Sequence, residues 1–414
     1  MNLFLLTVLV LCLLGVFHTY LFYPWWVVRR ARSRVPAKLV NRELSQLQKG
    51  NLPPWPQVYV LMAVHNEESV LLAKLNSLST QDYPGKLSFL IGSDCSTDAT
   101  NILLQQRSEE DKRFRNTLFQ SRQGKPNIIN QLAEQVLRAA ATDQRQSSAE
   151  QIFVLTDASV LLTPATITEL VRPLRADQKI GVVDATMVQT GGQAEGIGRS
   201  EEAYIDREVR IKRAEGWLWG AMIGPFGGCW AIRAEAFQPV PPAFLVDDFY
   251  LCMAAYESGY QGISSPKAIV REGVGQSIRA EFRRKVRISS GNWQNLVRFR
   301  KLWWPPYKNA LAFAFFSHKV LRWWTPFFIL FGALAWALLI LKTGNLWATV
   351  LFVLLTAALL AGALLDYFIA PLGLHFRVLR SWRYFLAMNA ALVVGFFRFL
   401  TGIKSNVWQP SQRH

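Results

Sequence analysis

Long apolar runs lie at both ends of this 414-residue chain, with a more polar stretch between them. Residues Leu3 to Val28 are nearly all apolar, which suffices to cross about 30 Å of hydrocarbon at about 1.5 Å per residue. Arg29 and Arg30 follow this run, whereas no Lys or Arg precedes it. A cleaved signal peptide has basic residues before a shorter apolar core. The pattern therefore predicts an N-terminal transmembrane helix, residues 1–28, with its arginine end in the cytosol.

Two further apolar runs, Trp323–Leu341 and Leu346–Leu365, predict membrane spans in a C-terminal region. A third run, Tyr384–Leu400, is short and contains Arg398, and the tail after it is basic. A simple charge count would place that tail outside the cell. The run is therefore consistent with either a tilted or a re-entrant helix.

A basic segment with interleaved apolar residues precedes these runs. It extends from Arg279 to Lys301, and Trp303 and Trp304 follow it. The stretch Ala310–Arg322 is a second candidate of this kind, because polar residues interrupt it. A basic helix face binds lipid headgroups, while aromatic side chains enter the boundary with the acyl chains. We expect interfacial amphipathic helices here, with membrane lipids as partners.

The formal net charge of +17 constrains the class of partner. Such an excess is typical of proteins that bind nucleic acid, an acidic membrane surface or an anionic substrate. The basic residues cluster beside the apolar runs and no nucleic-acid-binding module accompanies them, so we expect no nucleic-acid partner. The four cysteines lie far apart and form no C-x-x-C pair. This spacing argues against a disulfide framework or a structural zinc site and fits a reducing cytosol.

Between about Pro53 and Lys267, short apolar runs alternate with helical patterns. The expected strands are Gln57–Ala63, Ser88–Gly92 and Ile152–Thr156, and the expected helices are Glu68–Leu78 and Thr97–Gln106. This alternation predicts an α/β domain with a mostly parallel, Rossmann-like sheet that binds ligands at the carboxyl ends of its strands. The predicted division of the chain is an N-terminal transmembrane helix (1–28), a basic linker (29–52), the α/β domain (53–280), basic interfacial helices (281–322), a C-terminal transmembrane region (323–402) and a tail (403–414).

Six motifs of acidic, small polar and basic residues occur in sequence along this region. They are Ala63 to Glu68, Gly92 to Asp98, Gly124 to Asn130, Thr156 to Ser159, Val246 to Asp248 and Arg283 to Arg287. In this order they resemble the family 2 glycosyltransferases of the GT-A fold, the group that contains the cellulose, chitin and hyaluronan synthases. The resemblance extends from about Val58 to Gln294. It implies a GT-A catalytic domain that takes a sugar from a nucleotide-sugar donor.

The first three motifs supply candidate donor-binding residues. Asp94 ends a strand and can accept hydrogen bonds from a base or a ribose. In the alternative it is only a turn residue before the next helix, although Asp98 fits a helix cap better. By the resemblance, His65 and Glu67 close the same pocket, with Glu67 as the nucleotide contact and His65 equally able to serve as a stacking ring. Lys125 can reach the diphosphate as a point charge, or it is a solvated loop lysine.

Asp157 is the candidate metal ligand. Departure of a nucleoside diphosphate concentrates negative charge, which Mg2+ or Mn2+ stabilises as a Lewis acid. Members of the family commonly have Asp-x-Asp at this point, whereas this chain has Asp157-Ala158-Ser159. Ser159 therefore offers at best a hydroxyl or a water-mediated contact. The alternative is that Asp157 only caps a helix.

Asp248 is the candidate general base. The family's Thr-Glu-Asp motif aligns with Val246-Asp247-Asp248, and the leucine expected three residues later is present as Leu251. By this resemblance, the Asp248 carboxylate takes the proton of the acceptor hydroxyl as the new bond forms. Attack from the face opposite the leaving group inverts the anomeric centre, so an α-linked donor gives a β-linked product. In the alternative, both aspartates only face the positive end of a helix dipole.

The remaining candidates concern the diphosphate and the acceptor. Polymerising members of the family carry Gln-x-x-Arg-Trp. Here Arg287 retains the arginine, which can neutralise the diphosphate, but the Gln and Trp are absent, which weakens the case for processive polymerisation. The run from Pro225 to Trp230 resembles the family's acceptor-binding loop, in which Gly227 and Gly228 would allow close approach of the backbone to the acceptor. Trp230 either stacks on an acceptor sugar or belongs to the core.

These features predict an integral membrane glycosyltransferase of the bacterial inner membrane, with a cytosolic catalytic domain. Its expected substrates are a nucleotide sugar, with a UDP-sugar favoured, and a glycan or lipid-linked acceptor. A non-catalytic nucleotide-sugar-binding subunit of a polysaccharide export system is the alternative, and the incomplete Asp-x-Asp motif supports it. A transporter without chemistry is a third possibility, but it would leave the polar domain without a role.

Overall fold

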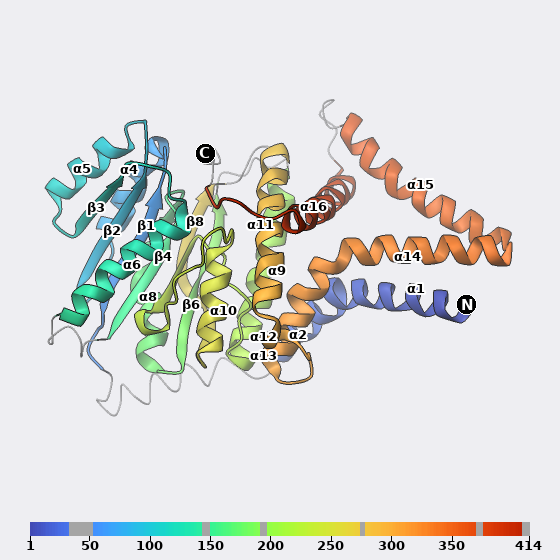
Figure 1. Ribbon diagram of the computed structural model, residues 1–414, viewed down its shortest axis with the longest axis horizontal. Coiled ribbons are helices and arrows are strands. Elements are labelled where there is room, and N and C mark those ends of the chain that lie inside the picture. The colour runs from blue at the N-terminus through green and yellow to red at the C-terminus, as the bar shows by residue number, and fades with distance from the viewer. Residues whose placement is uncertain (33–52, 143–149, 191–196, 274–277, 370–375, 408–414) are drawn as a thin grey trace. The chain divides into compact units, whose positions relative to one another are not determined.

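The computed structural model describes residues 1–32, 53–142, 150–190, 197–273, 278–369 and 376–407 (Figure 1). The chain divides into two compact units. The helical unit comprises Met1–Val27, Gly192–Tyr204 and Gln276–Gly402, and the α/β unit comprises Val28–Gly191, Ile205–Gly275 and Ile403–His414. Most of the predicted basic linker, residues 33–52, lies outside the described residues.

The described part of the α/β unit contains one eight-stranded sheet, with strand order β3-β2-β1-β4-β7-β6-β8-β5. The strands are β1 Gln57–Val64, β2 Leu87–Asp94, β3 Phe114–Phe119, β4 Gln151–Thr156, β5 Val160–Leu162, β6 Ile180–Thr190, β7 Cys229–Arg233 and β8 Gln261–Gly273. Strands β1 to β4 are parallel, β7 is antiparallel to both of its neighbours, β6 and β8 are parallel, and β5 is antiparallel to β8. The sheet confirms the predicted α/β fold with a mostly parallel, Rossmann-like half.

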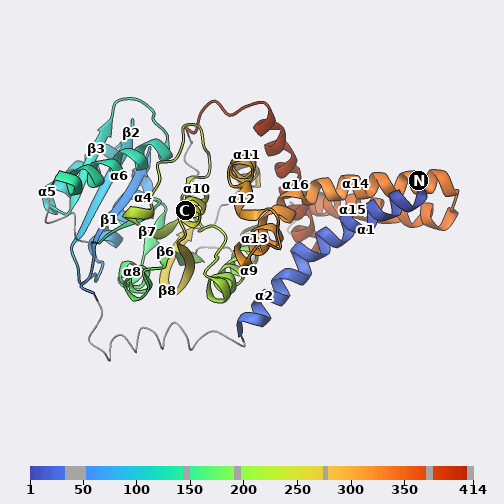
Figure 2. The ribbon, with the colours of Figure 1, turned by 60° about the horizontal axis from the view of Figure 1, so that its bottom comes forward.

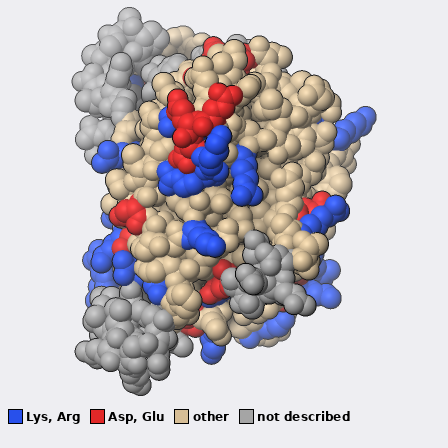
Figure 3. Space-filling view, turned by 90° about the vertical axis from the view of Figure 1, so that its left-hand side faces the viewer, with Lys and Arg blue, Asp and Glu red and all other residues tan. Residues whose placement is uncertain are grey.

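Helices cover this sheet and connect its parallel strands. They are α4 Glu68–Ser79, α5 Thr100–Glu110, α6 Lys125–Thr142, α8 Thr166–Ala176, α9 Ile197–Trp219, which begins in the helical unit, the short 3-10 helix η2 Ala234–Ala236, and α10 Asp247–Glu257. Helix α6 packs against β1 and β2, α5 against β3, and α8 against β6 and β8. The face seen in Figure 3 carries acidic and basic side chains next to one another rather than in a patch of one sign.

The three predicted strands are all present, and burial explains why they could be recognised. Every residue of β4 is buried, and so is every residue of β1 except Gln57. Strands buried on both faces require near-continuous apolar runs, which is the pattern that the sequence shows. Helix α5 begins at Thr100 rather than at Thr97, because the Asp98 carboxylate accepts a hydrogen bond from the Thr100 backbone N–H at 3.0 Å. The N-cap position is Ala99, so Asp98 is a turn residue just before the helix rather than the expected cap.

The helical unit consists of long helices and short helical turns. They are α1 Asn2–Phe17, the π-helical turn η1 His18–Phe22, α2 Tyr23–Arg32, α11 Ile278–Arg298, α12 Arg300–Trp303, α13 Ala310–Phe315, the π-helical turn η3 Phe316–Val320, α14 Leu321–Thr343, α15 Leu346–Ile369 and α16 Arg377–Leu400; the last residues of α2 belong to the α/β unit. Figure 2 shows α1 and α14 side by side, and α1 packs against α14 and α11 against α16.

Among the described residues, three helical runs are long and apolar enough to cross a membrane: Asn2–Arg32, Ala310–Thr343 and Val378–Leu400. The described apolar part of α15, Leu346–Ala358, is shorter. The expected boundary between the interfacial helices and the transmembrane region, at residues 322 and 323, falls inside the helical run Ala310–Thr343. Its polar residues do not interrupt the helix, because Ser317 and His318 are buried in the unit and η3 accommodates them without a break.

Candidate active site

The loops that follow β1 and β2 are joined by reciprocal hydrogen bonds. The Glu68 N–H donates to the Asp98 carboxylate at 3.1 Å, and the Ala99 N–H donates back to the Glu68 carboxylate at 2.8 Å. Asn66, which has a positive φ of 51°, accepts a hydrogen bond from the Thr97 N–H at 2.8 Å. The two loops therefore form one rigid edge at the carboxyl ends of the parallel strands, where the motifs place the donor-binding residues.

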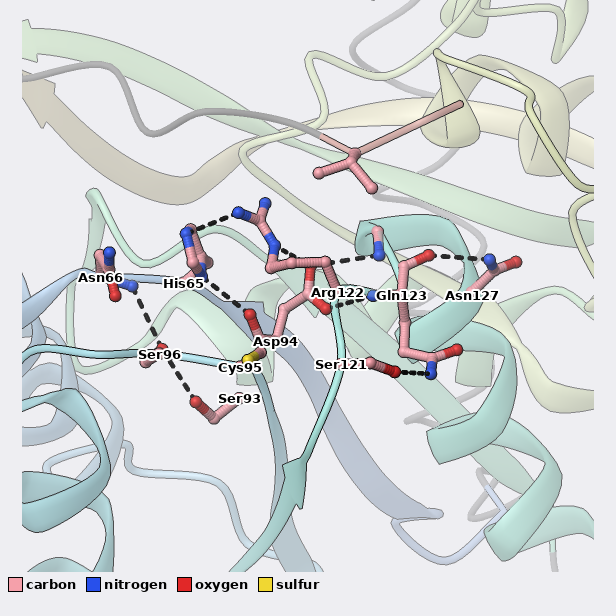
Figure 4. Close-up of polar contacts among 12 residues, drawn as sticks. His65, Asn66, Ser93, Asp94, Cys95, Ser96, Ser121, Arg122, Gln123 and Asn127 are labelled. Carbon is pink, nitrogen blue, oxygen red and sulfur yellow. Dashed lines mark hydrogen bonds and ion pairs between the residues drawn. The ribbon is translucent and has the colours of Figure 1, made fainter. Parts of the chain in front are cut away.

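Asp94 is fully buried and its carboxylate is bound by the chain itself (Figure 4). It accepts hydrogen bonds from Arg122 Nε at 3.1 Å, from the Gln123 N–H at 2.5 Å and from the Gly124 N–H at 3.1 Å. His65 lies beside it, with Nδ1 2.8 Å from the Asp94 carbonyl oxygen and Nε2 2.7 Å from Arg122 Nη1. The structure thus joins His65 and Asp94, and it adds Arg122 to them.

Arg122 was not singled out in the sequence. Its place just before the Gly124-Lys125 motif was the available signal, because a basic residue next to a phosphate-binding candidate adds a second positive charge. Asn406 gave no signal at all, since it lies in the C-terminal tail. Its side chain packs on Gly124, where an added Cβ would fall 2.2 Å from the Asn406 Oδ1. Position 124 therefore requires glycine both for space and for its φ of +82°.

Lys125 lies beside the aspartates of two further motifs. Its ammonium lies 2.6 Å from Asp157 Oδ1 and 3.9 Å from Asp247 Oδ2, and Asp248 also contributes to its electrostatic environment. Asp157 directly follows β4, whereas Asp247 and Asp248 form the first turn of α10. The structure therefore brings three sequence-predicted residues, Lys125, Asp157 and Asp248, into one cluster.

The electrostatics of this cluster reflect an excess of carboxylates. Burial lowers the pKa of Lys125, but Asp157, Asp247 and Asp248 outweigh that effect and raise its pKa above the ordinary value. Burial and the neighbouring Asp247 raise the pKa of Asp248 to about 7. Burial, followed by repulsion from Asp157 and Asp98, raises the pKa of Glu67 to about 7.

The glycine-containing loop before β7 lies against Asp248. A Cβ added to Gly227, whose φ is +83°, would fall 2.3 Å from Asp248 Oδ2. The Gly228 carbonyl accepts hydrogen bonds from the Asp157 N–H at 3.1 Å and from Thr156 Oγ1 at 2.9 Å. This loop therefore lies between the carboxylate after β4 and the carboxylate at the start of α10, and a side chain at Gly227 would collide with the latter.

Comparison with known proteins agrees with this geometry. Residues 59–240 match the family described as "Glycosyl transferase family 2", and residues 217–369 match the one described as "Glycosyl transferase family group 2". The two matches overlap and extend from residue 59 to residue 369. This chain belongs to the family 2 glycosyltransferases.

The chain is also similar to two individual glycosyltransferases. A curated N-acetylglucosaminyltransferase of Rhizobium leguminosarum bv. viciae is 24% identical over 257 residues, which cover 59% of this chain and 57% of that protein. The solved structure of the mannosyltransferase PcManGT from Pyrobaculum calidifontis, in complex with GDP-Man and Mn2+, has a TM-score of 0.59 and 22% identity. That likeness covers 90% of this chain and 99% of the mannosyltransferase, and it shows the GT-A fold.

The surroundings of Asp157 decide whether a divalent cation fits there. Among the described residues, no group of three His, Cys, Asp or Glu side chains could hold a metal ion. Ser159 donates to Glu272 Oε1 at 3.3 Å. Mg2+ commonly uses one or two protein carboxylates and completes its shell with substrate phosphates and water. The partly exposed Asp157, in a cluster with more carboxylates than ammonium groups, fits that one-carboxylate arrangement.

Trp230 and Arg287 lie on other elements than the clustered residues. Trp230 is only 1% exposed within β7, so it belongs to the core and cannot stack on an acceptor sugar, which corrects its assignment as an acceptor-binding residue. All five residues of β7 are buried, so both faces of this strand are covered. Arg287 lies on α11 in the helical unit, and its role toward the diphosphate stays a prediction.

Proposed function

We propose that this glycosyltransferase inverts the anomeric centre, moving a sugar from a nucleotide sugar, with a UDP-sugar favoured, to a membrane-associated glycan or lipid-linked acceptor. The observation that carries the proposal is the cluster of Lys125, Asp157 and Asp248. It combines a cation for phosphate, a carboxylate for a metal ion and a carboxylate with a raised pKa. These are the groups that sugar transfer from a diphosphate requires.

Two groups of residues hold the donor in this proposal. Lys125 and Arg122 supply positive charge for the diphosphate, and Lys125 must exchange part of its contact with Asp157 for a phosphate oxygen. Glu67 and His65 contact the nucleoside side of the donor, with Asp94 holding Arg122 in place. Asp157 would hold Mg2+ or Mn2+, which supplies Lewis-acid stabilisation of the departing diphosphate.

Asp248 acts as the general base in this proposal. Its pKa of about 7 lies much closer to the working pH than that of an ordinary aspartate, so it can accept a proton from an alcohol with useful driving force. The Phe249 N–H donates to Asp248 Oδ1 at 2.7 Å and leaves the second oxygen, which lies beside Gly227, for the acceptor hydroxyl. In-line attack from this side gives a β-linked product from an α-linked donor.

The acceptor is associated with the membrane in this proposal. Three helical runs of the chain have the length and composition of membrane spans, and basic residues follow the first of them. The absence of the Gln and Trp of the polymerising motif favours a glycan or lipid-linked acceptor that receives one or a few sugars. Gly227 and Gly228 would let the acceptor approach the backbone beside Asp248. The location we propose is the bacterial inner membrane, with the α/β unit in the cytosol.

The test is nucleotide release by the membrane-embedded enzyme across UDP-sugars and GDP-sugars, with and without Mn2+. Asp248→Asn should abolish turnover and leave nucleotide binding largely intact. Asp157→Ala should lower both turnover and the Mn2+ dependence of nucleotide binding. The control is Asp206→Asn, which removes an exposed carboxylate paired with Arg210 at 3.9 Å and should change neither. Normal turnover by Asp248→Asn would refute the base assignment, and unchanged metal dependence in Asp157→Ala would refute the metal assignment.

A further inference from the structure

Lys74 is a fully buried lysine on α4. The other buried residues of this helix are Leu71, Leu75 and Leu78, so the ammonium projects from an otherwise apolar face. Burying an ammonium without compensation costs several kcal/mol, roughly, which demands hydrogen-bond partners. Burial lowers the pKa of Lys74 to about 8, so the group still carries its proton at neutral pH.

Its partners bracket the turn that carries Asp157. Lys74 Nζ donates to Thr156 Oγ1 at 2.7 Å and to the Val160 carbonyl at 2.5 Å. Thr156 is the last residue of β4 and Val160 the first of β5, so one ammonium fixes both ends of the Asp157-Ala158-Ser159 turn. The position of the Asp157 carboxylate therefore depends on a contact with a helix 82 residues earlier in the chain.

The same ammonium sets the direction of a longer chain of hydrogen bonds. A protonated lysine can only donate, so Thr156 Oγ1 must accept from it and can use its own proton for another bond. That proton goes to the Gly228 carbonyl at 2.9 Å, which also accepts from the Asp157 N–H at 3.1 Å. A continuous path thus runs from Lys74 through Thr156 to Gly228.

This path ends beside the second carboxylate of the site. Gly227, the neighbour of Gly228, approaches Asp248 so closely that an added Cβ would fall 2.3 Å from Asp248 Oδ2. A change in the position of the Gly228 carbonyl would move Gly227 against or away from Asp248. The distance between the Asp157 and Asp248 carboxylates therefore depends on the hydrogen bonds that begin at Lys74.

We propose that Lys74 is a positioning residue, which fixes the Asp157 turn and the Gly227-Gly228 loop at the separation that transfer requires. This inference rests on the proposed roles of Asp157 and Asp248. Lys74 itself is fully buried, so neither donor nor acceptor can reach it without a rearrangement of the fold. Its effect on the rate comes from the geometry of the two loops, and a misplacement of about 1 Å at reacting groups can cost about 100-fold in rate.

The experiment is a double-mutant cycle of Lys74→Met and Thr156→Val on the full-length enzyme in membranes or detergent. Each single variant should lower kcat by about 10- to 100-fold, with a smaller change in KM for the donor. Because both break the same path, the double variant should be about as slow as the worse single variant. The control is Leu78→Ala on the same helix, which leaves a cavity and lowers Tm but should retain kcat.

Three results would overturn the inference: wild-type kcat in both single variants, losses that multiply in the double variant, or kcat losses that Leu78→Ala reproduces at the same fall in Tm. If Lys74→Met does not fold, the test is the kcat of Thr156→Val compared with the kcat of Leu78→Ala. Failure of the proposed function has a different signature, since Asp248→Asn would then stay active. An inactive Asp248→Asn enzyme with fully active Lys74→Met would refute only the role of Lys74.

Discussion

The carboxyl groups of Asp248 and Glu67 bind their protons more tightly in the folded protein than ordinary side chains do. A raised carboxyl pKa stabilises the fold below the unfolded-state value, about 4, and this contribution is lost as the pH rises through the folded-state value, about 7. Asp248→Asn removes a charge that the folded site holds unfavourably. The variant should therefore melt a few degrees above the wild type at pH 8 and show no difference near pH 4.

Thermal unfolding of the metal-free protein between pH 4 and pH 8 measures this effect. Glu67→Gln should also raise the Tm at pH 8, because the pKa of Glu67 is raised to about 7 as well. A Tm for Asp248→Asn below that of the wild type at pH 8 would show that Asp248 is stabilised as a carboxylate and would contradict the raised pKa.

Gly227 and Gly259 form a matched pair of glycines with positive φ, +83° and +89°. Alanine at either position costs about 1–2 kcal/mol of folding free energy from backbone strain. Only Gly227→Ala also drives a Cβ against Asp248, since nothing lies within 4 Å of a Cβ at Gly259. Gly227→Ala should therefore lower kcat by about 100-fold, whereas Gly259→Ala should retain activity at a similarly lowered Tm. Equal activity in the two variants would show that Asp248 tolerates displacement.

Some of these residues were recognisable in the sequence and others were not. Lys125, Asp157 and Asp248 could be found because each follows a strand or begins a helix, and such positions meet at one edge of an α/β sheet. Lys74 lies in a leucine-rich helix, where its spacing predicts only a position on one face. Its contacts with Thr156 and Val160 depend on how α4 packs, which no local pattern encodes. Trp230 is the opposite case: its motif suggested that it contacts an acceptor sugar, but every residue of its strand is buried.

At the level of elements, the parallel half of the sheet was predictable and the other half was not. Strands β1, β2 and β4 have continuous apolar runs because both of their faces are covered. Strand β7 has only five residues, and it lies between β4 and β6, which are distant from it in sequence. Strand β8 alternates in burial only in part and contains Pro266. Such strands owe their place to tertiary pairing rather than to local propensity.

The packing of α11 against α16 depends on one glycine. A Cβ at Gly395 would fall 2.4 Å from the Cβ of Ser289 on α11, and Ser289 and Ser290 both donate hydrogen bonds to carbonyls of α16. Gly395→Val should separate these helices and lower the Tm of the detergent-solubilised protein by about 5 °C or more. Gly332→Ala is the control, because the nearest atom to its added Cβ is Cys12 Cβ at 3.4 Å, an ordinary contact. Equal melting of the two variants would show that α11 and α16 are not held by this contact.

At the scale of the whole chain, the apolar runs were the strongest signal and the helix ends the weakest. The N-terminal run appears as one helical stretch, Asn2–Arg32, and the run after residue 310 appears as another, Ala310–Thr343. The polar residues Ser317 and His318 suggested a break, but both are buried and the helical run Ala310–Thr343 continues through them. Hydropathy reports transfer into lipid and cannot distinguish a polar residue that faces lipid from one that faces protein.

Three runs of this length predict that the protein is integral to the membrane. In membranes washed with alkaline carbonate, which releases peripheral proteins, the full-length chain should stay in the pellet, and it should enter the supernatant only with detergent. An immunoblot of both fractions measures the outcome, with a known peripheral protein as the control. Release by carbonate alone would show that these helices do not cross the bilayer.

The occupied state of Asp94 has a consequence for how a donor enters. Its carboxylate already has three partners in Arg122, Gln123 and Gly124, so a nucleoside that uses Asp94 must displace some of them. Recognition is then an exchange between an internal ligand and an external one, and the observed dissociation constant equals the intrinsic one divided by the fraction of molecules in which the Asp94 carboxylate is available. Weak affinity for the free nucleotide, and a rapid release of the spent diphosphate, would follow from the same competition.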